Sequence, residues 1–432
     1  MISLAKFRSL AERNAGRAFH ALTGIGATLV AVQGLSFLAN LLVVRSLSVT
    51  DYAILTSSLS IVGMLGALAD SGLAQAALTV GGLHHESAEE KAQVLRRCRL
   101  LIFRTGAVAS LVIVPVWFFM VQRLGGTPGE LAGIAVVLFG GFFVTLGLNI
   151  FKSFLLLEGK RVMLQKLDVI KTVARVALLA AGIWLIPDAA FVIACASVTE
   201  AGAWWFCRHQ LSHLTAREAE PSPVIKREVS AIFWRMMPAS IYKATSSQIF
   251  LLLLVAFGSV GGVAGAGALG RFHQFFTVVN SLSATIFAPR LARATGARER
   301  NRKLPLYTAC GWLAAVVVCA GVASVATPVL QWFGPAYADL TSELRVFMVS
   351  GCMYTMTGVL AGMLNARGWV MPPALVIGVD LAFTVLAILL CDVSTLWGYI
   401  WMNCLVNGAC LFAAVGWTCF CLFSRRHEEA LA

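Results

Sequence analysis

Long apolar stretches alternate with short polar connectors along the whole 432-residue sequence. Most of the stretches contain about 20 residues or more, enough for an α-helix to cross the hydrocarbon core of a bilayer. They lack the residue-by-residue alternation that is typical of a membrane β-barrel. We therefore predict twelve membrane-spanning helices, at about 23–44, 52–80, 100–122, 131–156, 163–186, 189–207, 230–257, 262–289, 305–330, 341–364, 370–391 and 395–422.

The composition supports this reading, because 59% of the residues are hydrophobic and only 13% are charged. An ordinary soluble domain has about 25% charged residues. The sequence thus predicts an all-α, polytopic membrane protein. Its formal net charge of +13 would suggest nucleic acid in a soluble protein. Here we expect no nucleic-acid partner, because the basic residues determine the membrane topology and contact anionic lipid headgroups.

The distribution of Lys and Arg predicts the topology. Of the 34 basic residues, 24 fall before the first span, in every second connector or after the last span, and the intervening connectors and span ends hold only Arg45, Arg123 and Arg345. Short loops rich in Lys and Arg remain cytoplasmic. We therefore expect both termini to be cytoplasmic, preceded at the N-terminus by a basic segment of about 20 residues.

The most polar connector divides the predicted spans into two equal groups. It contains Pro221 and Pro223. We predict an N-terminal six-helix lobe over 1–207, a cytoplasmic linker over 208–229 and a C-terminal six-helix lobe over 230–432. Six spans per half give both halves the same orientation, which is the parallel-repeat plan of many transporters.

No motif for catalysis or cofactor binding is present. The sequence contains neither a P-loop for ATP nor an H-E-x-x-H zinc motif. Most of the 11 cysteines lie in apolar spans and suggest neither a metal site nor a disulfide framework. We expect no catalytic residue, no cofactor and no metal. A transport cycle would then draw on a H+ or Na+ gradient, the membrane potential or the substrate gradient.

Cations inside the spans are the candidate substrate-binding residues: Lys171, Arg175, Arg235, Lys243 and Arg271. A charge at mid-span costs roughly 2.5–3.5 kcal/mol and therefore faces protein or a hydrated cavity. Lys243 lies about 21 Å from either end of its predicted helix, too far to reach the headgroups. Arg235, like Lys152, lies near a cytoplasmic end and can extend its stem to the headgroups.

Four carboxylates also fall inside the spans and are candidates for ion coupling: Asp70, Asp168, Glu200 and Asp380. Each either binds a coupling ion or pairs with one of the cations, and we favour pairing. Asp168, Lys171 and Arg175 share one helix face, so Asp168 could neutralise Lys171. Asp380 stands alone in an apolar span and is the best candidate for coupling.

Three short segments carry a family resemblance. Residues 44–53 read VRSLSVTDYA, residues 68–73 read LADSGL and residues 332–338 read WFGPAYA. The first two resemble the opening of bacterial polysaccharide flippases, and the third is similar to an aromatic-glycine-tyrosine turn of the same proteins. The span number and the distribution of charge extend the likeness over nearly the whole chain. The sequence thus resembles the Wzx-like flippases of the multidrug/oligosaccharidyl-lipid/polysaccharide (MOP) exporter superfamily.

The resemblance implies two six-helix lobes around a V-shaped cavity, as in MATE and other MOP exporters. It implies that the protein carries undecaprenyl-diphosphate-linked oligosaccharides across the bacterial inner membrane by alternating access. The products would be O-antigen, capsule or exopolysaccharide. The intramembrane cations would compensate the diphosphate. Besides this cargo and membrane lipids, the partners could include other polysaccharide-assembly proteins.

Three alternatives remain open. A cation-coupled multidrug exporter of the same superfamily would be expected to have a carboxylate-rich cavity. A membrane polysaccharide polymerase or ligase would need a long periplasmic loop, and none is predicted. A membrane scaffold that transports nothing would leave Lys243 without a role.

Overall fold

The computed structural model describes residues 30–84, 86–216, 220–246, 248–292, 297–367, 369 and 371–431, and these residues form helices without any strand. The basic segment predicted at the N-terminus lies outside these ranges. The first half contains the helix Val30–Ser46, α2 (Val49–Asp70), α3 (Leu73–Leu83), α4 (Ala88–Arg123), α5 (Pro128–Leu157), α6 (Arg161–Gly182), α7 (Ala189–Gln210) and α8 (Ser212–Thr215).

The second half is more often interrupted. It contains α9 (Pro223–Ser246), α10 (Ile249–Phe257), α11 (Val260–Gly270), α12 (His273–Leu282), the π-helical turn η1 (Ser283–Phe287), α13 (Ala288–Ala292), α14 (Ala297–Ser324), α15 (Ala326–Phe333), the 3-10 turn η2 (Pro335–Tyr337), α16 (Thr341–Arg367), α17 (Pro373–Leu390) and α18 (Leu396–Leu431).

Each predicted span has a helical counterpart among the described residues. Eight segments are long and apolar enough to cross a bilayer, and the bent pair α9–α10 makes a ninth. The remaining three correspond to the helix Val30–Ser46, to the charge-bearing α6 and to the interrupted run from α11 to α13. The protein is therefore an all-helical, multi-pass membrane protein.

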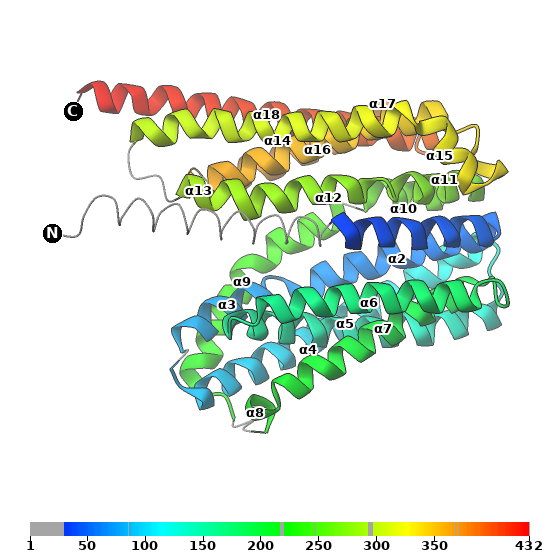
Figure 1. Ribbon diagram of the computed structural model, residues 1–432, viewed down its shortest axis with the longest axis horizontal. Helices are drawn as coiled ribbons and strands as arrows, with labels where there is room; N and C mark the ends of the chain where they lie inside the picture. Colours follow the sequence, from blue (N-terminus) through cyan, green and yellow to red (C-terminus); the bar gives the residue numbers. More distant parts are fainter. Residues whose placement is uncertain are drawn as a thin grey trace, which may run out of the picture.

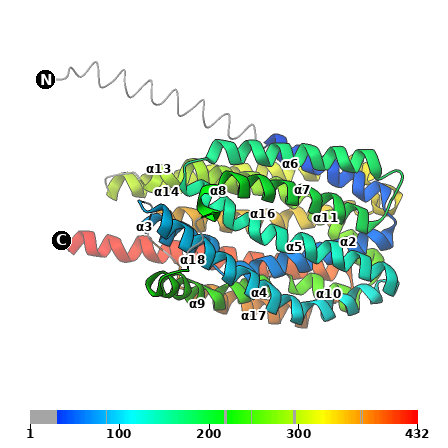
Figure 2. The same cartoon turned by 90° about the horizontal axis from the view of Figure 1, so that it is seen from below.

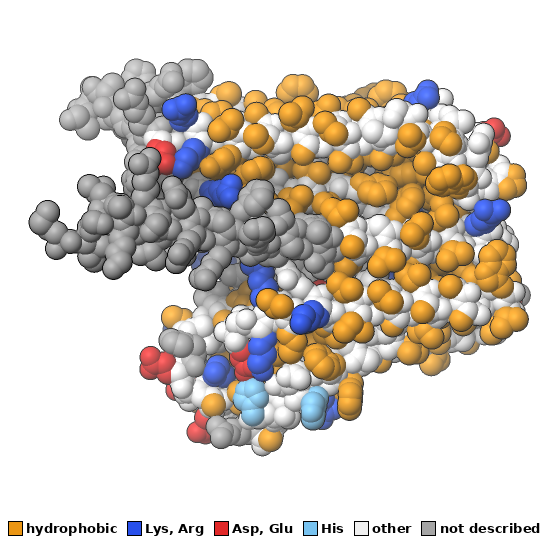
Figure 3. All heavy atoms as spheres, in the orientation of Figure 1, with side chains coloured by type: hydrophobic (Ala, Val, Ile, Leu, Met, Phe, Trp, Pro, Cys, Tyr) orange, Lys and Arg blue, Asp and Glu red, His pale blue; other side chains and the backbone are white. Residues whose placement is uncertain are grey.

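The helices form two layers that lie side by side with their axes nearly parallel. Helices α2–α7 make one layer and α12–α18 the other, and the two layers diverge toward the end that carries the C-terminus (Figure 1). The view from below shows α6 on one flank of the molecule and α9 and α17 on the other (Figure 2). On the face shown in Figure 3, hydrophobic side chains are spread over both layers, and most of the visible Lys and Arg lie toward the end that carries the C-terminus.

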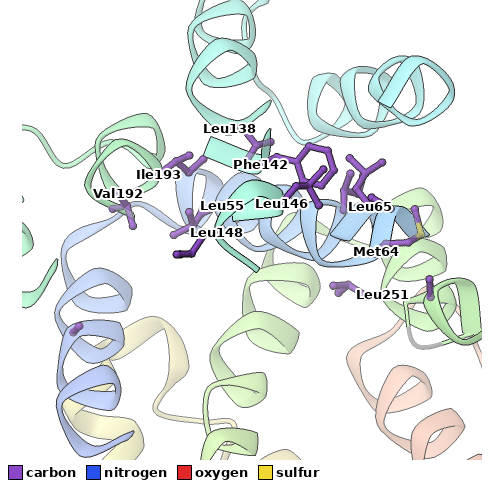
Figure 4. Packing of buried hydrophobic residues seen from close by; sticks show 14 of the residues in the cluster. Leu55, Met64, Leu65, Leu138, Phe142, Leu146, Leu148, Val192, Ile193 and Leu251 are labelled. Carbon is purple, nitrogen blue, oxygen red and sulfur yellow. The ribbon is translucent and has the colours of Figure 1, made fainter. Parts of the chain in front are cut away.

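Helices α2, α5 and α7 pack together in the first layer. Leu65 of α2 lies against Phe142 and Leu146 of α5, and Val192 and Ile193 of α7 lie toward the other side of the same view (Figure 4). All five side chains are less than 9% exposed. Because apolar side chains are as soluble in lipid as in a protein interior, such contacts stabilise the layer mainly through close packing.

The second membrane passage is broken between α2 and α3. Ser71 and Gly72 adopt left-handed backbone angles, with φ of 34° and 81°. A Cβ at Gly72 would lie 2.5 Å from Sδ of Met236, which packs onto the break from α9. Glycine therefore meets two needs here, a positive φ and a close helix approach.

Helix α9 connects the two layers. The predicted linker 208–229 is largely helical where it is described, because α7 extends to Gln210, α8 follows and α9 already begins at Pro223. The beginning of α9 is fixed to the first layer by two hydrogen bonds. The Ser222 backbone N–H donates to Gln93 Oε1 at 2.9 Å, and the Arg97 guanidinium donates to the Ser230 hydroxyl at 2.9 Å.

Candidate functional site

Six charged residues form a connected group in the middle of the first layer and at the α11–α12 junction. We call this group the charged cluster: Lys152, Asp168, Lys171, Arg175, Glu200 and Arg271. Lys152 of α5 donates to Asp168 of α6 at 2.7 Å, and Lys171 of α6 donates to Glu200 of α7 at 2.8 Å. The side chains of the second pair are 22% and 24% exposed, so both groups are largely withdrawn from solvent.

Two arginines of the charged cluster have no carboxylate within ion-pair distance among the described residues. Arg175 lies one turn beyond Lys171 on α6, and its buried Nε has no hydrogen-bond partner in the ranges that the structure describes. The charges of Arg271 and Glu200 act on its guanidinium. Four cations thus face two carboxylates in the cluster, which leaves two positive charges uncompensated.

Arg271 lies where the eighth passage is interrupted, between α11 and α12. Its Nε donates to the hydroxyl of Tyr52 at 3.1 Å, and its guanidinium carbon lies 5.9 Å from the centre of the Tyr52 ring. Tyr52 is fully buried at the beginning of α2 and packs edge-on against Tyr337. Arg271 therefore connects the charged cluster to a contact between the two layers.

Aromatic rings from both halves of the chain pack together next to the contact between Arg271 and Tyr52. Phe37 of the helix Val30–Ser46 packs against Phe272, Phe275 and Phe333 from the second layer, at centroid distances of 5.5, 5.0 and 5.9 Å. Two of the segments that carry the sequence resemblance, 44–53 and 332–338, therefore meet here through Tyr52 and Tyr337.

Lys243 and Asp380 lie in another part of the protein, on α9 and α17. The Tyr242 hydroxyl donates to Asp380 at 2.5 Å, and Cys410 Sγ of α18 lies 3.7 Å from the same carboxylate. Lys243 follows Tyr242 in sequence and is exposed, with no ion pair or hydrogen bond from its ammonium group to any described residue. It is seven residues beyond Met236, so it lies on nearly the same face of α9, toward the α2–α3 break.

Asp70 and Arg235 also stand apart from the charged cluster. Asp70 ends α2, and its carboxylate accepts a hydrogen bond from the backbone N–H of Ala74 at 2.9 Å. Arg235 is exposed on α9, which agrees with a side chain that extends to the headgroups. The structure thus brings together Asp168, Lys171, Arg175, Glu200 and Arg271 and leaves Asp70, Arg235, Lys243 and Asp380 outside.

The one specific pairing that the sequence suggested, Asp168 with Lys171, is wrong. Asp168 pairs with Lys152 and not with Lys171, so Lys152 does not extend to the headgroups. Pairing with a cation is confirmed for Asp168 and Glu200 but not for Asp70 and Asp380, whose described partners are a backbone amide and a tyrosine. Sequence analysis also missed Tyr52 as a partner of Arg271, although it had singled out the segment 44–53.

The sequence matches no family model, and no curated protein matches it. Solved structures, in contrast, match nearly the whole chain. An inward-facing multidrug resistance MATE family transporter of the MOP superfamily has a TM-score of 0.73 at 15% identity, over 94% of this chain and 98% of that chain. This chain has the MATE-like fold.

Two further structures share this fold. The lipid II flippase MurJ, in an inward closed conformation, has a TM-score of 0.70 at 10% identity, over 93% of this chain and 87% of that chain. An outward-facing MATE transporter has a TM-score of 0.60 at 15% identity, over 95% and 96% of the two chains. The fold expected from the sequence is thus confirmed, and the polysaccharide specificity stays a prediction.

Proposed function

We propose that this protein is a flippase for polyprenyl-diphosphate-linked oligosaccharides in the bacterial inner membrane. The lipid tail would remain in the bilayer while the diphosphate and the sugars cross between the two layers. The single observation that supports this most is the pair of uncompensated arginines, Arg175 and Arg271, deep in the charged cluster. A diphosphate is the most costly part of such a cargo to bring into the membrane, and two guanidinium groups would offset its charge.

The two layers suit alternating access. They are joined at the end where Arg271 meets Tyr52, and they diverge toward the end with the C-terminus (Figure 1). In the proposed cycle, cargo enters from the diverging, cytoplasmic end and reaches the charged cluster. The Arg271 contact then opens toward the periplasm. Lys171 and Glu200 neutralise each other next to this path, so they leave the positive charge on Arg175 and Arg271.

Asp380 remains the proposed coupling residue, with H+ or Na+ as the ion. Its described partners are the Tyr242 hydroxyl and the Cys410 thiol, so no described cation neutralises it. Asp70 is the second candidate, because among the described residues only the Ala74 backbone amide is bonded to its carboxylate. Lys243 lies on the α9 face that turns toward α2, and we propose that it meets the cargo as it enters.

The test is a flipping assay in proteoliposomes, with a fluorescent undecaprenyl diphosphate that carries a short oligosaccharide. Charge-assisted hydrogen bonds contribute about 1.5–3 kcal/mol each, so replacing both Arg175 and Arg271 by alanine should slow flipping roughly tenfold or more. Arg123→Ala is the matched control, because Arg123 is exposed at the end of α4, away from the cluster. Normal flipping by the double variant would refute the proposal.

A cation-coupled multidrug exporter is the alternative, and two observations favour it. The matched inward-facing structure is a multidrug MATE transporter, and Asp70 and Asp380 have no cationic partner among the described residues. The same vesicles can be assayed for accumulation of a cationic dye. Dye transport that requires Asp70 or Asp380 and does not require Arg175 or Arg271 would favour this alternative.

A further inference from the structure

Helix α12 begins two residues after Arg271 and presents polar side chains on its open face. Phe276 and Val279 are buried, whereas Thr277 is exposed and Asn280 and Ser281 are partly exposed. Exposed polar groups are unfavourable against lipid, so this face of a membrane helix is expected to line water or a polar ligand. Phe275, two residues before Thr277 and thus on the opposite side of α12, packs on Phe37 of the helix Val30–Ser46.

An aromatic pair borders the same face. The His273 ring of α12 lies 5.2 Å from the Tyr354 ring of α16, at an interplanar angle of 56°. Tyr354 is 47% exposed, and its hydroxyl makes no hydrogen bond to the described part of the chain. The Tyr354 ring therefore packs against His273 and still leaves part of its surface accessible to a ligand.

Two glycines of α16 bring α12 close on either side of Tyr354. A Cβ at Gly351 would lie 2.6 Å from Phe276, and a Cβ at Gly358 would lie 3.0 Å from Asn280 Oδ1. The two glycines are seven residues apart and share one helix face. Tyr354 lies between them in sequence, three residues after Gly351 and four before Gly358, so it borders the same helix contact.

Amide groups next to the aromatic pair have unused hydrogen-bonding capacity. Gln274 Nε2, a donor, and Asn280 Oδ1, an acceptor, are buried and have no hydrogen-bond partner in the described part of the chain. A buried polar group without a partner costs about 1–3 kcal/mol. A ligand with many hydroxyl groups could satisfy both after a small adjustment of the side chains.

We infer that α12 and α16 form a carbohydrate-binding platform, in which a sugar ring stacks on Tyr354 and its hydroxyls bond to His273, Gln274 and Asn280. This inference rests on the proposed function, because it assigns the sugar part of the same cargo. An exposed aromatic ring with neutral donors and acceptors suits a polar, uncharged ligand better than a lipid tail. From Arg271 to Asn280 the chain advances roughly 14 Å along the passage, so the diphosphate and the sugars would occupy neighbouring sites.

The test measures binding of two probes to the full-length protein in nanodiscs: undecaprenyl diphosphate, and the same lipid with two N-acetylhexosamine units. Tyr354→Ala should weaken binding of the glycosylated probe about tenfold, which corresponds to 1.4 kcal/mol. Binding of the sugar-free probe should change less than about twofold on the same scale. Tyr354→Phe keeps the ring and should retain most of the affinity for the glycosylated probe.

Phe412→Ala is the matched control, because Phe412 is an aromatic residue of α18 that is 80% exposed. It should leave the binding of both probes unchanged. Equal losses for the two probes in Tyr354→Ala would show a structural role and overturn the platform, as would no loss at all. If the unaltered protein binds neither probe, the proposed function itself fails, and the platform fails with it.

Discussion

Arg271 donates a hydrogen bond from Nε to the hydroxyl of Tyr52 at 3.1 Å, and this bond joins the second layer to the first. Tyr52 is fully buried, and the guanidinium also lies over its ring. The group proposed to bind the diphosphate is thus one that holds the layers together at this end. An anion that draws Arg271 away from Tyr52 would weaken the closure.

Tyr52→Phe should loosen this closure while it retains the ring contacts to Arg271 and Tyr337. A hydrogen bond to a charged group contributes about 1.5–3 kcal/mol, so the open population should rise roughly tenfold or more. Thr56→Cys provides the readout, because Thr56 is 6% exposed on the same helix. Peptide-level mass spectrometry should detect faster labelling by a membrane-impermeant maleimide. Tyr307→Phe is the control: it alters a ring that stacks on Phe287 and should leave the labelling rate unchanged. A labelling rate in Tyr52→Phe equal to that of the control would contradict the prediction.

Gly267→Ala should prevent the two layers from closing at this end. A Cβ at Gly267 would lie 2.1 Å from Thr56 Oγ1 and 2.7 Å from its Cγ2, which is closer than atoms can approach. We expect loss of flipping, because α2 and α11 would have to separate to accommodate the added methyl group. Gly261→Ala is the control on the same helix, because its Cβ would meet no atom within 4 Å.

A second variant separates this steric effect from general misfolding. Thr56→Gly removes the side-chain atoms with which the methyl group added by Gly267→Ala would collide, so the combination of both substitutions should recover part of the flipping rate. The glycine introduced into α2 costs about 1 kcal/mol of helix stability, and recovery should therefore be incomplete. Normal flipping by Gly267→Ala alone would show that the α2–α11 contact does not control access.

The sequence predicted the helices well because the signal for a span is local. A run of about 20 apolar residues must be helical in lipid, whatever its neighbours are. The pairing of charges is a property of the assembled layers. Asp168 and Lys171 share a face of α6, yet Asp168 bonds to Lys152 of α5 and Lys171 to Glu200 of α7. Helix spacing alone could not distinguish these partners from each other.

The interruptions of the helices were also difficult to predict. The break at Ser71 and Gly72 falls in the segment 68–73, which the sequence analysis had quoted only for its family resemblance, and its geometry depends on Met236 from a distant helix. The junction at Arg271 contains no proline, and only the structure shows that the helix is interrupted there. The charged cluster has an excess of positive charge however its members pair, because it contains four cations and two carboxylates.

The pair Lys171–Glu200 should stabilise the protein only as a pair. Lys171→Met leaves Glu200 partly buried without a cation, and breaking such a pair costs up to about 3–5 kcal/mol. Lys171→Met combined with Glu200→Met should recover most of that loss, because two apolar side chains replace the ions. Thermal unfolding in detergent measures both variants. If the losses of the two single variants simply add in the double variant, the pair does not act as a unit.

His84 should make the anchoring of α9 depend on pH. Its Nε2 lies 3.1 Å from Glu228 of α9 and its Nδ1 lies 2.8 Å from Glu90 of α4. The hydrogen bond to Glu228 is the main cause that raises the pKa of His84 above its ordinary value of about 6.5, and the bond to Glu90 adds to it. A pKa raised by folding contributes stability that is complete below about 6.5 and is lost as the pH rises through the folded-state value.

His84→Gln should therefore lower thermal stability at pH 6 and make little difference at pH 9, because the neutral ring can donate to only one of the two carboxylates. His209→Gln is the control, because His209 is exposed and stacks on Trp205. The difference between the unaltered protein and His84→Gln should shrink steadily as the pH rises between these values. A difference that stays constant with pH would mean that His84 holds α9 without its charge.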